Sequence, residues 1–169
     1  DDGTAESYNY PGDYLAAYHQ WAVKFGPVTS PFVLCGARAA IARTIPDTLH
    51  TPILFAVYLA DGPGGLPGTL IQDGLTGSIG NDVGGIPTGT NWAQMMIKDD
   101  LGQPLIINAS EFYVAVGCED FAKMEAFGRD TNGAMAHRSY LYDACLDEWL
   151  SEDDPLHEYV FPGNRMIRV

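Results

Sequence analysis

Four aromatic residues are candidates for binding chemistry. They are Trp92, Tyr140, Tyr142 and Trp149. Tyr140 and Tyr142 lie two positions apart, so in a strand they share one face, and Trp149 follows two acidic residues, which favours partial exposure. A flat ring offers an apolar platform to the C–H face of a pyranose, while neighbouring amides and carboxylates bind its hydroxyl groups. These residues therefore predict a surface that binds polysaccharide.

The alternative for a tryptophan is burial in the core, because large aromatic rings are highly buried on average. We expect burial of Trp21, which lies in the run Trp21–Phe25. For Trp92 the sequence leaves burial and exposure equally open.

Oxygen-bearing side chains near the two ends of the chain are candidates for a structural calcium site. Asp1, Asp2 and Glu6 cluster at the start, and Asn164 lies near the end. Calcium binds about six to eight oxygen atoms and needs no strict linear motif. These four residues would form a site if the ends of the chain pair. The alternative is that they are ordinary turn and capping residues.

No catalytic motif is evident in the sequence. The four histidines are scattered and share no metal-ligand spacing. Neither a P-loop nor a dinucleotide-binding glycine motif before a helix occurs, and Ser78 lacks the surroundings of a nucleophile elbow. Glycoside hydrolysis needs two facing carboxylates, and 22 acidic residues single out no pair. We therefore expect a protein that is not an enzyme.

Three cysteines, Cys35, Cys118 and Cys145, form no C-x-x-C pair, so a zinc site or a thioredoxin-like motif is not supported. Cys35 ends the apolar run Phe32–Cys35 and is expected to be a buried, inert thiol. Cys118 and Cys145 flank the last group of expected strands and are candidates for a disulfide if the protein is exported.

The charge of the chain restricts its partners. Its 169 residues fit a single domain, 1–169, with 9 Lys and Arg against 22 Asp and Glu and a net charge of −13. Such a surface repels nucleic acid and anionic lipid, and no apolar run reaches the roughly eighteen residues of a membrane span. We expect no nucleic-acid binding, no membrane insertion and an extracellular setting. The start at Asp1, without a signal peptide, suggests a mature segment of a longer protein.

Short apolar runs separated by Gly, Pro, Asn and Asp clusters predict an all-β protein. Glu111–Gly117 and Lys123–Phe127 flank the polar pair Glu119 and Asp120 and predict a hairpin, and Asp61–Gly68 predicts a loop. With about eight to ten short strands and no alternating helices, we expect an antiparallel β-sandwich. The other expected strands are Gln20–Phe25, Phe32–Thr44, Ile53–Leu59, Leu70–Gln72, Asn91–Ile97, Pro104–Asn108, Arg138–Tyr142 and Met166–Val169.

Several short motifs follow one another in a recurring order. They are Asp1–Glu6, Trp21–Phe25, Gly36–Arg38, Asp61–Gly68, Glu111–Val114, Arg138–Tyr140 and Gly163–Arg168. Their order resembles secreted bacterial jelly-roll-like modules appended to extracellular peptidases and surface proteins, which are similar in layout to carbohydrate-binding and adhesin modules. The resemblance spans nearly the whole chain and implies a non-catalytic, exported jelly-roll-like sandwich that binds or adheres outside the cell. It carries no ligand residue, and the chain departs from it at Cys118 and in the acidic segment Asp143–His157.

Self-assembly is the alternative function. Strand-like ends, a body of low charge and many aromatic residues would let a sheet edge extend into a neighbouring copy. Asp1–Tyr10 would then act as a donated strand of a cell-surface or filament subunit. An ordinary edge strand within one chain is the simpler expectation for the same residues.

Overall fold

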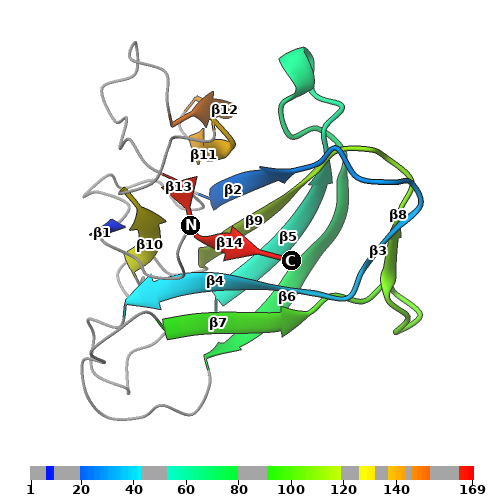
Figure 1. Cartoon of the computed structure of the whole chain (residues 1–169), viewed down its shortest axis with the longest axis horizontal. Helices are drawn as coiled ribbons and strands as arrows, with labels where there is room; N and C mark the ends of the chain where they lie inside the picture. The colour runs from blue at the N-terminus through cyan, green and yellow to red at the C-terminus, as the bar shows by residue number, and fades with distance from the viewer. Residues whose placement is uncertain are drawn as a thin grey trace.

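The computed structural model of the chain describes residues 7–9, 20–42, 53–79, 91–118, 126–131, 137–143, 146–152 and 164–169. In these segments the chain forms antiparallel strands, labelled β1 to β14, and one 3-10 turn, η2 (Pro63–Gly65), with no α-helix (Figure 1). The all-β prediction is therefore confirmed. No helix within the described segments has the length and the hydropathy that crossing a lipid bilayer requires.

Two sheets, A and B, face one another. Sheet A contains β1 (Ser7–Asn9), β10 (Ala126–Asp130), β4 (Gly36–Ala42), β7 (Asn91–Met96), β13 (Asn164–Arg165) and β14 (Ile167–Arg168). Sheet B contains β6 (Leu70–Ile79), β5 (Ile53–Leu59), β9 (Phe112–Cys118), β2 (Gln20–Phe25), β11 (Ser139–Asp143) and β12 (Glu148–Ser151). The end of β6 also pairs with β7 and so joins the two sheets. A separate pair, β3 (Phe32–Leu34) with β8 (Leu105–Ile107), closes one end of the sandwich (Figure 1).

The strands pair as nested hairpins. The pairs are β1 with β10, β2 with β9, β4 with β7 and β5 with β6, so early strands meet late strands and the innermost two are neighbours in the chain. Contacts of β10 with β4 and of β9 with β5 complete the two sheets. This order is that of a jelly roll, in which two antiparallel sheets share one core. The expected jelly-roll-like sandwich is thus confirmed, and the hairpin of β11 and β12 extends sheet B beyond β2.

The core lies between the sheets and follows the two-residue period of the strands. Ala37, Ala39 and Ile41 of β4 face Phe112, Val114 and Val116 of β9 across this core. Trp21 is only 3% exposed and its ring centroid lies 4.9 Å from that of Phe127. The expected burial of Trp21 is therefore confirmed.

The predicted hairpin between Glu111–Gly117 and Lys123–Phe127 is wrong. Strand β9 pairs with β2 and β5 in sheet B, whereas β10 pairs with β1, β4 and β13 in sheet A. Both edges of β9 are occupied, and its residues from Phe112 to Gly117 are all buried. Two apolar runs beside a polar turn are equally typical of central strands in different sheets, so the local pattern did not distinguish the two arrangements.

The expected strand Phe32–Thr44 is divided at Cys35, and the expected burial of this thiol is also wrong. Cys35 is a free, exposed cysteine between β3 and β4. Side chains alternate here, so Leu34 is buried while Val33 and Cys35 point outward. An apolar run at a sheet edge therefore carries a thiol on its solvent side.

Candidate functional site

Five aromatic side chains gather on the outer face of sheet B, and we call them the aromatic cluster. They are Tyr58, Tyr113, Tyr140, Tyr142 and Trp149. The structure thus brings together three of the four residues predicted to bind a ligand. Tyr58 and Tyr113 were missed because they lie in apolar runs typical of core strands, and only their alternation with inward residues marks the outer face.

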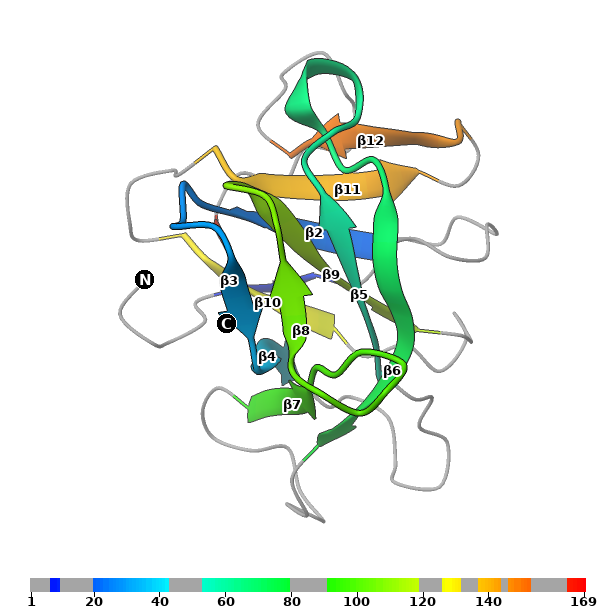
Figure 2. The same ribbon diagram turned by 90° about the vertical axis from the view of Figure 1, so that its right-hand side faces the viewer.

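Three alanines form the floor beneath the rings. Ala22, Ala115 and Ala56 lie side by side across β2, β9 and β5 and are buried. Figure 2 shows β12, β11 and β2 in succession at one end of sheet B. In a flat sheet β12 would lie about 19 Å from β5, four strand spacings away, yet the rings of Trp149 and Tyr58 are 5.4 Å apart. The curvature of the sheet and the lean of these two long side chains together bring the rings into contact, and the small floor residues leave room for them.

The rings pack against one another edge to face. The centroids of Tyr113 and Tyr140 lie 5.2 Å apart at an angle of 84°, and those of Tyr142 and Trp149 lie 5.3 Å apart at 53°. Aromatic pairs favour such tilted contacts over face-to-face stacking. Tyr113 is fully buried, whereas the other four rings remain half-buried. Part of each of those four rings therefore faces solvent.

Hydrogen bonds anchor three of the phenols. Tyr113 donates to the carbonyl of Gly65 at 2.6 Å, in the predicted loop after β5, and Tyr58 donates to Gln20 Oε1 at 2.9 Å. Tyr142 donates to the carboxylate of Asp147. These contacts orient the rings without help from a ligand.

The environment of the phenols raises their pKa values. Burial is the main cause for Tyr58 and Tyr113. The bond to Asp147 is the main cause for Tyr142, whose pKa rises to about 12. All three hydroxyls therefore stay protonated and serve as donors near neutral pH.

The rim of the aromatic cluster is polar and largely acidic. Gln20 and Asp147 bind the phenols of the cluster, and the charge of Asp73 contributes to the raised pKa of Tyr58. On another side Lys24 and Glu111 form an ion pair of 3.0 Å, with the Lys24 ammonium 5.9 Å from the Tyr113 ring centroid. The surface thus combines half-buried rings with amide and carboxylate acceptors.

Trp92 lies apart from this cluster, on the outer face of sheet A. Its ring is half-buried and lies 4.7 Å from the guanidinium carbon of Arg38 and 4.8 Å from that of Arg168. Gln94 is exposed on the same face, because it is registered opposite Arg38. We call Arg38, Trp92, Gln94 and Arg168 the arginine face. No local pattern in the sequence indicated that these arginines and Trp92 would meet, since they come from β4, β14 and β7.

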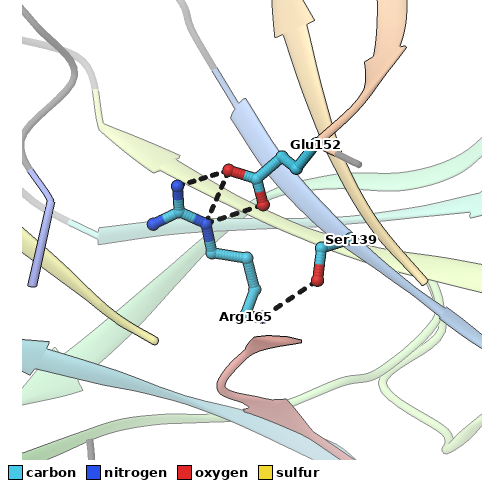
Figure 3. A network of polar contacts seen from close by, with 3 residues as sticks. All are labelled: Ser139, Glu152 and Arg165. Carbon is cyan, nitrogen blue, oxygen red and sulfur yellow. Dashed lines mark hydrogen bonds and ion pairs between the residues drawn. The ribbon is translucent and has the colours of Figure 1, made fainter. Parts of the chain in front are cut away.

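A buried ion pair holds the hairpin that carries much of the aromatic cluster. Arg165 Nε donates to Glu152 Oε2 at 2.8 Å, and a second guanidinium nitrogen contacts Oε1 (Figure 3). The Arg165 amide donates to Ser139 Oγ at 2.9 Å, and the guanidinium carbon lies 5.0 Å from the Trp21 ring centroid. The two charged residues are 4% and 3% exposed. This network ties the C-terminal strand to β11 and β12 and so positions Tyr140, Tyr142 and Trp149.

The predicted calcium and disulfide residues fall mostly outside the described segments. Asp1, Asp2, Glu6 and Cys145 lie outside them. Asn164 begins β13, where its backbone is registered opposite Asp130, and Cys118 ends β9. Within the described segments no group of three or more His, Cys, Asp or Glu residues could hold a metal ion. The calcium site and the disulfide therefore stay predictions.

The two ends of the described chain both pair with β10. Ser7 of β1 and Arg165 of β13 are registered opposite the same residue, Arg129 of β10. They therefore lie on opposite edges of β10, and the two terminal strands do not pair with each other. This register also means that β1 pairs within its own chain, at the edge of sheet A.

No protein-family model, no curated protein and no solved structure matches the chain. The resemblance to secreted jelly-roll modules therefore stays a prediction, and the function is argued from the chain's own surfaces.

Proposed function

We propose that the chain is a non-catalytic extracellular binding or adhesion module that binds a polysaccharide or a cell-surface glycan through the aromatic cluster. One observation carries the proposal. Four half-buried rings lie on one curved face, with amide and carboxylate acceptors at its rim.

The chemistry of this face fits a neutral sugar chain. The exposed parts of Trp149, Tyr58 and Tyr140 offer apolar area to the C–H faces of pyranose rings. Asp147, Asp73 and Gln20 supply acceptors for sugar hydroxyl groups. Because the rim is largely acidic, it disfavours a glycan that carries carboxylates.

The cluster is ordered before any ligand binds. Its phenols donate to Gly65, Gln20 and Asp147, and its rings pack against each other. Binding then costs little additional side-chain ordering, which favours affinity from a small contact area.

Retention on insoluble neutral polysaccharides tests the proposal. Cellulose, chitin and unsubstituted mannan, which carry no carboxylates, are incubated with the whole chain, with Trp149→Ala and with the matched control Trp92→Ala on the other sheet. We expect retention of the whole chain on at least one of them, a roughly tenfold or greater loss for Trp149→Ala, and no change for Trp92→Ala. The proposal would be contradicted if the whole chain bound none of the three polysaccharides, or if Trp149→Ala were retained as well as the unmodified chain.

A calcium ion at the chain ends, held by Asp1, Asp2, Glu6 and Asn164, belongs to the same proposal. An ion that binds only the folded state stabilises it by mass action, by about 2.7 kcal/mol at 100 times its dissociation constant. We expect EDTA to lower the melting temperature and added calcium to restore it. A melt that does not respond to either addition would remove the ion from the proposal.

Self-assembly through Asp1–Tyr10 has less support than glycan binding. Ser7–Asn9 already pair with β10 of their own chain, so a donated strand would first have to leave that position.

A further inference from the structure

A second surface, on the opposite sheet, has different chemistry. The arginine face brings together side chains from three strands, because Arg168 of β14 is registered opposite Arg38 of β4, and Ala40 of β4 is registered opposite Trp92 of β7. Both guanidinium groups lie within 5 Å of one ring centroid. The chain has only 9 basic residues against 22 acidic ones. Two of these nine cations on a single ring therefore make a concentrated positive region on an acidic protein.

The two guanidinium carbons lie 4.7 and 4.8 Å from the same ring centroid, so both cations are held near one aromatic ring that offsets part of their mutual repulsion. A cation over an indole face is attracted by the ring quadrupole. Arg38 is exposed, and no ion pair joins it to a carboxylate within the described part of the chain. An anion placed beside the exposed guanidinium of Arg38 would gain charge-assisted hydrogen bonds there.

A hollow of about 660 Å³ lies on this face. Its lining includes Arg38, Arg168 and Gln94, together with Met96, whose side chain is 63% exposed. Gly36 and Met95 also line it, and the backbones of β4 and β7 approach closely there, since a Cβ on Gly36 would lie 2.8 Å from the Met95 carbonyl oxygen. The hollow thus has cations, an amide and an apolar thioether in one place.

The size and lining of the hollow restrict the anion. The hollow is wide and open, so a bare sulfate or phosphate would contact only a part of its lining. Planar carboxylates match the fork of a guanidinium, Gln94 can bind hydroxyl groups, and Met96 offers an apolar contact to a ring. A densely charged nucleic acid is disfavoured by the net charge of −13.

We propose that the arginine face binds an acidic saccharide, a sugar chain with a uronic acid carboxylate that pairs with Arg38. Trp92 acts as a positioning residue that holds the two guanidinium groups together. The site is separate from the aromatic cluster and goes beyond the proposed function, since it has the opposite charge and lies on the other sheet.

Calorimetric titration of the whole chain tests this site. The probes are a galacturonic acid trimer, a hyaluronan tetrasaccharide and the same galacturonic acid trimer with its carboxyl groups reduced to alcohols. We expect at least one acidic probe to bind, binding to weaken as salt is added, and the reduced trimer to bind at least tenfold more weakly. Tighter binding of the galacturonic acid trimer would indicate a plant-type glycan, and tighter binding of the hyaluronan tetrasaccharide would indicate an animal-type glycan.

Variants assign the binding to this face. Arg38→Gln should weaken binding of the acidic probe about tenfold or more, and Trp92→Leu should weaken it as well. Lys98→Gln is the matched control, because it removes one exposed positive charge outside the hollow, and it should bind like the unmodified chain. Circular dichroism and a thermal melt confirm that each variant is folded.

Four outcomes would overturn the proposal. They are no binding of either acidic probe, equal binding of the reduced trimer, equal losses for Arg38→Gln and Lys98→Gln, and displacement of the trimer by inorganic sulfate at the same concentration. Trp149→Ala leaves this face intact, so failure here and failure of the neutral-glycan proposal are distinguishable.

Discussion

The outer faces of the two sheets both present a tryptophan, but the surroundings of the two rings differ. On sheet B, Trp149 packs against Tyr58 and Tyr142, and the nearby polar groups are carboxylates and an amide. On sheet A, Trp92 lies beside Arg38 and Arg168, next to an open hollow. The neighbours of a half-buried ring, rather than the ring itself, should therefore decide which ligand a face can accept. On sheet B the rings stabilise one another, whereas on sheet A the ring holds two cations.

Glu152→Gln should have the largest effect on stability. It leaves the Arg165 charge buried without its carboxylate, so we expect a loss of about 3 kcal/mol or more in the free energy of unfolding. Urea denaturation measures this loss. The β11–β12 hairpin should loosen with it and weaken binding at the aromatic cluster.

The matched control is Glu111→Gln in the ion pair with Lys24, whose two side chains are 42% and 23% exposed. Exposed pairs contribute at most about 1 kcal/mol, so this change should have a much smaller effect. Equal losses for the two variants would show that burial of the Arg165–Glu152 pair is not what stabilises the hairpin.

Tyr113→Phe should have an intermediate effect on the sheet B face. It removes the hydrogen bond to Gly65 and leaves the ring in place, so we expect a loss of about 1 kcal/mol in the free energy of unfolding. Thermal melting detects it. Tyr142→Phe, which removes a bond to the exposed Asp147, serves as the comparison and should lose less. A larger loss of unfolding free energy for Tyr142→Phe than for Tyr113→Phe would show that the buried hydrogen bond is not the more stabilising of the two.

High pH should act on the same face with the smallest effect. The pKa of Tyr142 is about 12 in the folded chain against an ordinary value of 10, mainly because of its bond to Asp147. The folded state therefore holds this proton more tightly, so its contribution to stability is complete below pH 10 and is lost as the pH rises through about 12.

An ultraviolet titration of tyrosinate measures this effect. We expect an ionisation centred near pH 12 that is absent from Tyr142→Phe. An ionisation near pH 10 for Tyr142 in the folded chain would show that the bond to Asp147 is not maintained.

Much of the fold could be predicted from the sequence because it depends on local patterns. The predicted strand Ile53–Leu59 has the same bounds in the structure, and Asp61–Gly68 forms the predicted loop. Strand partners depend on distant parts of the chain, which explains the incorrect hairpin and the separate positions of β9 and β10. Burial of Cys35 was wrong because an apolar run does not reveal which of its alternating sides is covered.

The candidate sites were predictable in part for the same reason. Tyr140 and Tyr142 share a strand, and their common face followed from their spacing. The sequence did not predict the position of Tyr113 on the outer face, because both faces of β9 are covered and its whole run is apolar. The arginine face combines three strands that are far apart in the chain, so no linear motif marks it.

The alanine floor and the rings above it have a consequence for strand β9. Its inner face lies against the sandwich core, its outer face lies under the aromatic cluster, and β2 and β5 occupy both of its edges. Deuterium from solvent reaches its amides only when both layers open. Strand β9 should therefore exchange last of all the described strands, at a rate that reports global unfolding.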